Sequence, residues 1–327
     1  MLRAVSPDRS ASSAIVIVSA TRLPSAFPLA ATVRPYRRAR TGPYHHRVVD
    51  APDAVPGPLR ERARAYLAGP RETVAPRHAA TVVLLRDTHE GLEVYLLRRA
   101  GTMAFAAGMH VFPGGSVDQR DGDASPAWAG PAPDEWARRL GCDEPLARAL
   151  VCAAVRETFE ESGVLLAGPS RTTSPSTSTY TVVGDTTADE WERDRLALLD
   201  RSLSMSGLLE RRGLVLRSDL LAPFAHWITP EFEPRRFDTR FFAAALPAGQ
   251  RARDISGEAD HATWVGVRGA VRAHEAGEMA MLPPTIEALR DLAAYSDVAG
   301  ALAAPRQLRP ILPRLVESDG ALRLVVE

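Results

Sequence analysis

Short apolar runs between turn residues mark the first strands that the sequence predicts. Residues 79–86, AATVVLLR, are rich in β-branched side chains and apolar enough throughout for a buried strand. His89-Glu90-Gly91 predicts a turn, and residues 92–98, LEVYLLR, predict the hairpin partner of that strand. The same reasoning predicts three later strands, at residues 224–229, 237–246 and 262–267.

The clearest helical pattern covers residues 144–162. Apolar residues recur there every four positions in two rows, Leu146-Leu150-Ala154 and Val151-Val155-Phe159. Gly163 then stands where a glycine commonly ends a helix. Other helices are predicted at residues 58–67, 134–140, 188–211, 271–277 and 284–295.

Strands on both sides of one central helix, followed by more strands and helices, predict a mixed α/β layer structure. We expect one α/β domain over residues 71–300. A basic, Pro-rich and poorly ordered leader would precede it at residues 1–70, and an irregular tail would follow at 301–327. Residues 168–187 are rich in Ser and Thr and predict a mobile loop inside the domain.

The cationic side chains, apart from histidine, are all arginine. The 327 residues include 40 Arg but no Lys and no Asn, which excludes a lysine Schiff base, a P-loop lysine and an Asn oxyanion donor. An anionic ligand must therefore be held by arginine, backbone N–H groups or a metal ion. Residues 1–49 hold eight Arg against one acid, Asp8, so the rest of the chain has a net charge of −7. We expect that acidic part to repel nucleic acid polymers.

Two further features bear on the compartment. Residues 14–20 form the only clear apolar run of the leader, and this run is too short to span a membrane. We therefore favour a poorly ordered leader over a targeting segment, which stays an alternative. Cys142 and Cys152 lie ten positions apart and match no metal-binding spacing, which predicts reduced thiols, a cytoplasmic protein and no membrane partner.

Three glutamates share one edge of the helix predicted at residues 144–162. Glu157 precedes Glu160 and Glu161 by three and four positions, so the three carboxylates lie on one side. Like charges at this spacing repel by roughly 0.2–0.5 kcal/mol per pair on an exposed helix, and the helix dipole disfavours anions in the last turns. A hard divalent cation with oxygen ligands would offset that cost. The alternative is a solvated helix face with an Arg156–Glu160 ion pair, but it leaves the Phe-Pro-Gly-Gly turn at residues 112–115 unexplained.

These residues resemble the Nudix box of the Nudix hydrolases, G-x5-E-x7-R-E-U-x-E-E-x-G-U, in which U is aliphatic. The residues that match are Gly115, Arg156, Glu157, Glu160, Glu161, Gly163 and Val164. Three features depart from the pattern: Thr158 at an aliphatic position, Arg148 at the position of the first glutamate, and a long insertion at residues 116–143. An insertion in an exposed loop costs little closure entropy, so the two halves of the box can still meet.

A split box is similar to that of the acyl-coenzyme A diphosphatase branch of the family, and so are the runs at residues 224–230 and 235–242. The coenzyme A signature of related enzymes is partly present. Arg99, Ala100 and Gly108 fall in register with it, whereas Leu97 and Ala104 replace a threonine and an arginine.

The resemblance implies a Nudix-type α/β/α sandwich with a mixed sheet and with helical and loop insertions. It also implies that Glu157, Glu160 and Glu161 bind Mg²⁺ or Mn²⁺ and that Arg156 orients Glu157. In these enzymes a general base often comes from a loop before a late strand, where this chain has Glu258. The candidate substrate-binding residues are Arg99, Gly114, Gly115, Arg236 and Arg240.

The reaction that the resemblance implies is hydrolysis of a diphosphate linkage in a small nucleotide. Coenzyme A or acyl-coenzyme A would give 3′,5′-ADP and (acyl-)4′-phosphopantetheine. Whether the chain forms a homodimer is left open by the sequence. One alternative is hydrolysis of ADP-ribose or of a dinucleotide. Another is a non-catalytic nucleotide sensor, although a pure binder need not keep a costly cluster of carboxylates.

Overall fold

The computed structural model of the chain describes residues 57–69, 73–101, 107–123, 126–169, 181–255, 259–318 and 321–325. By its contacts the chain divides into two units, Met1–Thr41 and Gly42–Glu327, and all described residues belong to the second. Most of the predicted leader, residues 1–56, and most of the Ser/Thr-rich loop, residues 170–180, lie outside the described residues.

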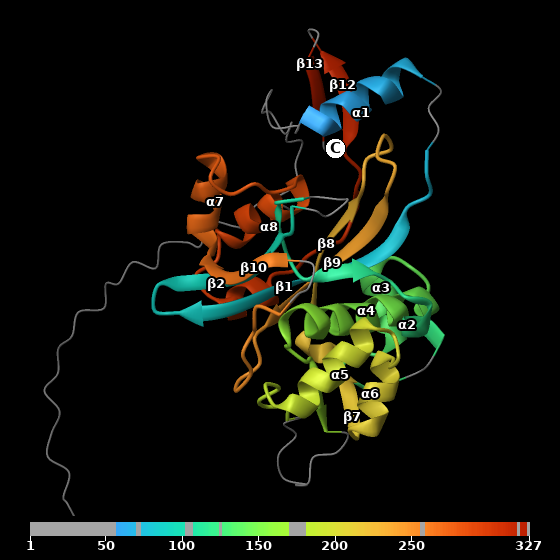
Figure 1. Cartoon of the computed structure of the whole chain (residues 1–327), viewed down its shortest axis with the longest axis vertical. Coiled ribbons are helices and arrows are strands. Elements are labelled where there is room, and N and C mark those ends of the chain that lie inside the picture. Colours follow the sequence, from blue (N-terminus) through green and yellow to red (C-terminus); the bar gives the residue numbers. More distant parts are fainter. Residues whose placement is uncertain are drawn as a thin grey trace, which may run out of the picture. The chain divides into compact units, whose positions relative to one another are not determined.

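A mixed sheet of eight strands forms the centre of the second unit (Figure 1). The strands are β1 (Arg77–Thr88), β2 (Gly91–Arg99), β3 (His110–Val111), β4 (Gly114–Ser116), β8 (Ala222–Ile228), β9 (Phe237–Ala245), β10 (Ala259–Gly266) and β11 (Pro310–Ile311). Their order is β10-β2-β1-β9-β8-β11, with β3 paired to β2 and β4 paired to β1. β1 runs parallel to β9 and β11 parallel to β8, and the remaining pairs are antiparallel.

Helices cover both faces of the sheet. Side chains alternate along each strand, so the apolar runs place apolar side chains on both faces, and helices pack on each. On one face, Val82 and Leu84 of β1 pack into a core with α3 (Pro133–Leu140) and α4 (Glu144–Ser162). On the other face, Val83 and Leu85 pack with α7 (Val267–Glu275), α8 (Pro283–Leu292) and α9 (Val298–Ala303). The expected α/β/α sandwich with a mixed sheet is confirmed.

The central helix α4 begins and ends where the sequence predicts. Asp143 caps its first turn, since the Asp143 side chain accepts a hydrogen bond from the Leu146 N–H at 2.9 Å. Gly163 ends it in the left-handed conformation, with φ of 73°. The hairpin of β1 and β2 and the strands β8, β9 and β10 also agree with the predicted segments within a few residues.

The insertion at residues 116–143 is largely folded. It contains α2 (Gln119–Asp123), β5 (Trp128–Ala129) and α3. β5 joins β6 (Ala167–Pro169) and β7 (Leu214–Arg217) in a second small sheet, ordered β5-β7-β6. The insertion therefore contacts later parts of the chain through β5, and it contacts the helix of the box because α2 and α3 both pack on α4.

Two segments differ from the expectations. The helix expected at residues 188–211 is two helices, α5 (Asp189–Leu199) and α6 (Met205–Arg211). The break has a physical cause, because Arg201 has a positive φ of 65° and Ser204 caps a new helix by accepting a hydrogen bond from the Gly207 N–H.

The tail expected to be irregular at residues 301–327 instead contains β11 and a hairpin of β12 (Arg314–Ser318) and β13 (Ala321–Val325). Within the expected leader, the helix predicted at residues 58–67 is present as α1 (Gly57–Ala68), and its Ala63 packs with Phe232 and Leu324. The described secondary structure thus includes α1, which precedes residue 71, and strands in the C-terminal segment. Among the described residues, none of the helices combines the length and the hydropathy that a membrane span requires.

Candidate active site

The two halves of the split box meet at the C-terminal turns of α4. β4 pairs antiparallel with β1 and brings Gly114 and Gly115 against the glutamates. The Gly114 N–H donates to Glu161 Oε2 at 2.8 Å. Gly115 lies so close to Glu157 that an added Cβ would be 2.5 Å from Glu157 Oε1. A glycine is therefore needed at position 115 for this approach.

Arg156 is the centre of a buried hydrogen-bond network. Its Nη1 donates to Glu157 Oε1 at 2.8 Å and to Glu160 Oε2 at 3.2 Å. Its Nε and Nη2 donate to the two carboxylate oxygens of Asp121, each at 2.9 Å, and Nη2 also donates to the Ser116 carbonyl at 3.0 Å. The Arg156–Glu160 pair thus exists, but Glu157 and Glu160 are only 9% and 7% exposed, so this edge of the helix is not solvated.

The cluster carries more negative than positive charge. Asp121, Glu157 and Glu160 all contact the single guanidinium of Arg156, and Glu161 lies one residue further on. Burial raises the pKa of Glu157 to about 7 and raises that of Glu160, and the charge of Arg156 offsets this only in part. A buried excess of carboxylates of this kind is stabilised by an added cation.

The fit to a divalent metal rests on the chemistry of these donors. Among the described residues, no three His, Cys, Asp or Glu side chains are already arranged around one metal position, because Glu157 and Glu160 turn toward Arg156. The donors are nevertheless all carboxylate oxygens, which Mg²⁺ and Mn²⁺ prefer. Glu157, Glu160 and Glu161 also line one cavity, so a cation could reach all three.

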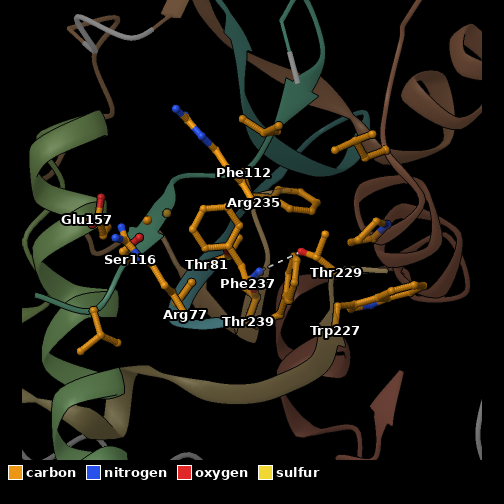
Figure 2. Close-up of a pocket in the computed structure, with 18 of the residues that line it drawn as sticks. Arg77, Thr81, Phe112, Ser116, Glu157, Trp227, Thr229, Arg235, Phe237 and Thr239 are labelled. Atoms are coloured by element: carbon orange, nitrogen blue, oxygen red, sulfur yellow. Dashed lines mark hydrogen bonds between the residues drawn. The ribbon is translucent and has the colours of Figure 1, made fainter. Parts of the chain in front are cut away.

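That cavity has a volume of about 1100 Å³ and joins two chemically different walls (Figure 2). Glu157 on α4 and Ser116 lie on one side of it, and Trp227 and Thr229 lie on the other, with Phe112 and Phe237 between them. The apolar wall is formed mainly by Phe112, Trp227, Phe237, Phe241, Leu282, Pro283, Pro284 and Pro313. The cavity can therefore hold a ligand with an anionic part at the glutamates and a less polar part along the aromatic side chains.

Three of the five predicted substrate-binding residues line the cavity, and two do not. Arg99, Gly114 and Gly115 line it. Arg236 is buried elsewhere, where its guanidinium donates to the Thr229 and Val74 carbonyls at 3.0 and 2.7 Å. Arg240 is also buried and hydrogen-bonds to Asp238, so neither arginine is placed to bind a ligand in this cavity. Glu258 lies outside the described residues.

The reason for the Arg240 error is strand alternation. On β9, Phe237, Thr239 and Phe241 line the cavity, so the side chains of Asp238 and Arg240 belong to the opposite face. Two arginines that sequence reasoning missed, Arg77 and Arg235, are exposed and line the cavity. Arg77 lies two positions before Ala79, which also lines the cavity, so the two side chains share one face of β1.

Asp121 and Arg120 were missed for a different reason. Both come from α2 inside the insertion, and no pattern in the sequence relates them to α4. Arg120 lines the cavity near the glutamates, pairs with Asp118 at 3.1 Å and donates to the Arg201 carbonyl at 2.7 Å. The insertion thus contributes side chains to the site itself.

Comparisons with known proteins agree with this geometry. The model of the NUDT19 Nudix domain matches residues 137–292. A Caenorhabditis elegans protein named "Putative nudix hydrolase 7" is 27% identical over 249 residues, which cover 75% of this chain and 70% of the worm protein. Acyl-coenzyme A diphosphatase NUDT19 of Xenopus laevis is 24% identical over 63% of this chain and 61% of its own length. The chain thus spans less than two thirds of that diphosphatase.

One solved structure is similar over most of its length. The crystal structure of a NUDIX hydrolase from Alicyclobacillus acidocaldarius is 28% identical, with a TM-score of 0.57, and the match covers 72% of this chain and 99% of that one. The match supports the α/β/α sandwich described above. Together with the Arg156–glutamate cluster, these findings support a Nudix hydrolase that resembles the NUDT19 members of that superfamily.

Proposed function

We propose that this Nudix hydrolase cleaves the diphosphate linkage of coenzyme A or acyl-coenzyme A. The products would be 3′,5′-ADP and 4′-phosphopantetheine or its acyl form. The observation that carries the proposal is the cavity of about 1100 Å³, which has the glutamate cluster at one wall and aromatic and proline side chains at the other. Such a cavity suits a diphosphate joined to a long, partly apolar arm better than it suits a compact nucleotide.

Glu157, Glu160 and Glu161 would hold Mg²⁺ or Mn²⁺, since Nudix hydrolases generally use divalent metal ions. When bound, such an ion would neutralise the diphosphate and lower the pKa of a water that attacks phosphorus. Arg156 keeps Glu157 and Glu160 in place through the two hydrogen bonds of its Nη1. Glu258 remains our proposal for the general base.

The anionic groups of the substrate would be bound by arginine and by backbone N–H groups. Arg99, Gly114 and Gly115 line the same cavity as the glutamates, and the two glycines contact Glu161 and Glu157. Arg77 and Arg235 add two exposed guanidinium groups, and guanidinium binds phosphate oxygens through parallel N–H donors. We propose these two in place of Arg236 and Arg240, whose donors are used within the fold.

A panel of substrates tests the proposal. The protein is incubated with Mg²⁺ or Mn²⁺ and separately with coenzyme A, an acyl-coenzyme A, ADP-ribose, NADH and diadenosine polyphosphates, and the products are identified by mass spectrometry. The proposal predicts fastest cleavage of coenzyme A or its acyl derivative to the two products above. Faster cleavage of ADP-ribose or of a dinucleotide would contradict it, and tight binding without turnover of any compound would favour a sensor.

A further inference from the structure

The insertion that splits the box contributes one buried carboxylate, which contacts the arginine that holds the glutamate cluster. Asp121 of α2 is 2% exposed. Its two oxygens accept hydrogen bonds from Nε and Nη2 of Arg156, each at 2.9 Å. Asp121 is not among the residues that line the cavity, and its Oδ2 also accepts a hydrogen bond from the Asp118 N–H at 2.8 Å. Its hydrogen-bonded connection to Glu157 and Glu160 runs through Arg156.

The hydrogen bonds of Arg156 account for every N–H of its guanidinium. Of the five N–H groups, two face Asp121, one faces the Ser116 carbonyl, and the two on Nη1 face Glu157 and Glu160. Because the guanidinium is planar, fixing the edge that carries Nε and Nη2 also fixes the direction of Nη1. The bidentate contact with Asp121 therefore determines where Arg156 holds the two glutamates.

The contact also sets the charge of the cluster. Without Asp121, the positive charge of Arg156 would be balanced by Glu157 and Glu160, both of which it touches. With Asp121 in place, one carboxylate already balances Arg156. The charge of the glutamates then stays available for a cation.

We propose, on the basis of the function proposed above, that Asp121 is a positioning residue for the glutamate cluster. It orients Arg156 and neutralises it, so that Glu157 and Glu160 keep the arrangement and the charge that bind a divalent cation. The sequence has Arg148 where the Nudix box has its first glutamate, and one carboxylate that contacts the arginine of the box comes from the insertion.

The simpler explanation is that the Asp121–Arg156 ion pair only stabilises the packing of α2 on α4. A matched pair elsewhere in the chain separates the two explanations. Arg306 and Asp291 form an ion pair at 2.9 Å with side chains only 10% and 9% exposed, and neither residue lines the cavity. Loss of the Asp291 charge should destabilise the fold as loss of a buried pair does, without reaching the glutamates.

The test is a calorimetric titration with Mn²⁺ alone, using the full chain and its Asp121→Asn and Asp291→Asn variants. Asp121→Asn is nearly isosteric, and Asp121→Ser is a second neutral variant in case the amide prevents folding. Circular dichroism checks that each variant is folded. We expect the Kd for Mn²⁺ to rise about 10- to 100-fold in the Asp121 variants, as for other partners of metal ligands, and to stay within about twofold in Asp291→Asn.

Kinetics provide a second readout. The Asp121 variants should lose kcat while KM for the diphosphate substrate stays nearly constant, and added Mn²⁺ should restore part of the loss. Wild-type affinity for Mn²⁺ in folded Asp121→Asn would overturn the proposal, and so would an equal weakening in Asp291→Asn. The titration does not depend on the substrate, so failure to cleave coenzyme A would refute the proposed function while leaving this result intact.

Discussion

Replacing Gly115 by alanine would test the role of the glutamate cluster separately from the stability of the fold. A Cβ at position 115 would lie 2.5 Å from Glu157 Oε1 and 2.7 Å from Glu157 Cδ, whereas ordinary contact begins at 3.4 Å. The nearest carboxylate oxygen must therefore retreat by roughly 0.9 Å, which is the difference between 3.4 and 2.5 Å. Its 2.8 Å hydrogen bond with Arg156 would break or lengthen.

The expected effects on rate and stability differ in size. A misplacement of about 1 Å at a catalytic group can reduce the rate about 100-fold. The free energy of unfolding should fall by only about 1–2 kcal/mol, since the group that moves is the terminal carboxylate of the Glu157 side chain and not the backbone. The assay is product formation from the best diphosphate substrate at saturating Mg²⁺, together with urea unfolding of the same protein samples.

A matched control is available at Gly184. A Cβ there meets nothing within 4 Å, and no left-handed φ is involved. Gly184→Ala should therefore match the wild type in rate and in stability. A Gly115→Ala variant with the wild-type rate would show that the position of the Glu157 carboxylate does not matter for turnover, which would contradict the role proposed for Glu157.

Three further predictions concern the cavity, the fold and pH. Arg235→Ala should raise KM about tenfold with little change in the free energy of unfolding, because Arg235 is exposed and lines the cavity. Arg236→Ala should lower the free energy of unfolding by about 1–3 kcal/mol, because the buried Arg236 guanidinium donates hydrogen bonds to two carbonyls. Steady-state kinetics and urea unfolding check both variants, and the reverse pattern would contradict the positions of the two arginines. Gly163→Ala should cost about 1 kcal/mol or more in urea unfolding, because φ is 73° there and a Cβ would lie 2.9 Å from Arg253 Nε; unchanged stability would contradict this. Burial raises the pKa of Asp238, but hydrogen bonding with a neighbouring histidine and the charge of a neighbouring arginine outweigh it and hold that pKa below its usual value. The stabilisation by the Asp238 carboxylate is therefore present above the unfolded-state pKa of about 3.9 and is lost as pH falls through the lower folded-state pKa. The difference in unfolding free energy between wild type and Asp238→Asn, measured by urea unfolding, should shrink below about pH 4. A constant difference from about pH 7 to about pH 3 would contradict this prediction.

The sequence predicted the parts of the site that are local in the chain. The helix at residues 144–162, its end at Gly163 and the shared edge of Glu157 and Glu160 follow from spacing alone, and the structure has them at the same residues. Gly115 could be related to the helix only through the family pattern. These features depend on the geometry of one helix and one turn, which the sequence determines closely.

The parts that the sequence could not predict depend on which segments meet. Asp121 and Arg156 are 35 positions apart and belong to different helices, so no periodicity relates them. Arg240 was expected at the cavity, but the register of β9 turns its side chain to the other face. The C-terminal hairpin was missed because its strands are short and pair only with each other.

In the proposed function, the carboxylates beside Arg156 form the catalytic metal site of a diphosphatase. The most direct measurement is the rate of coenzyme A hydrolysis in Mg²⁺ by the wild type and by Glu160→Gln and Glu161→Gln. Each substitution keeps the shape of the side chain and removes one negative charge from the cavity wall. We expect a loss of about 100-fold or more in kcat for each variant, with the fold retained. An unchanged rate in either folded variant would contradict it.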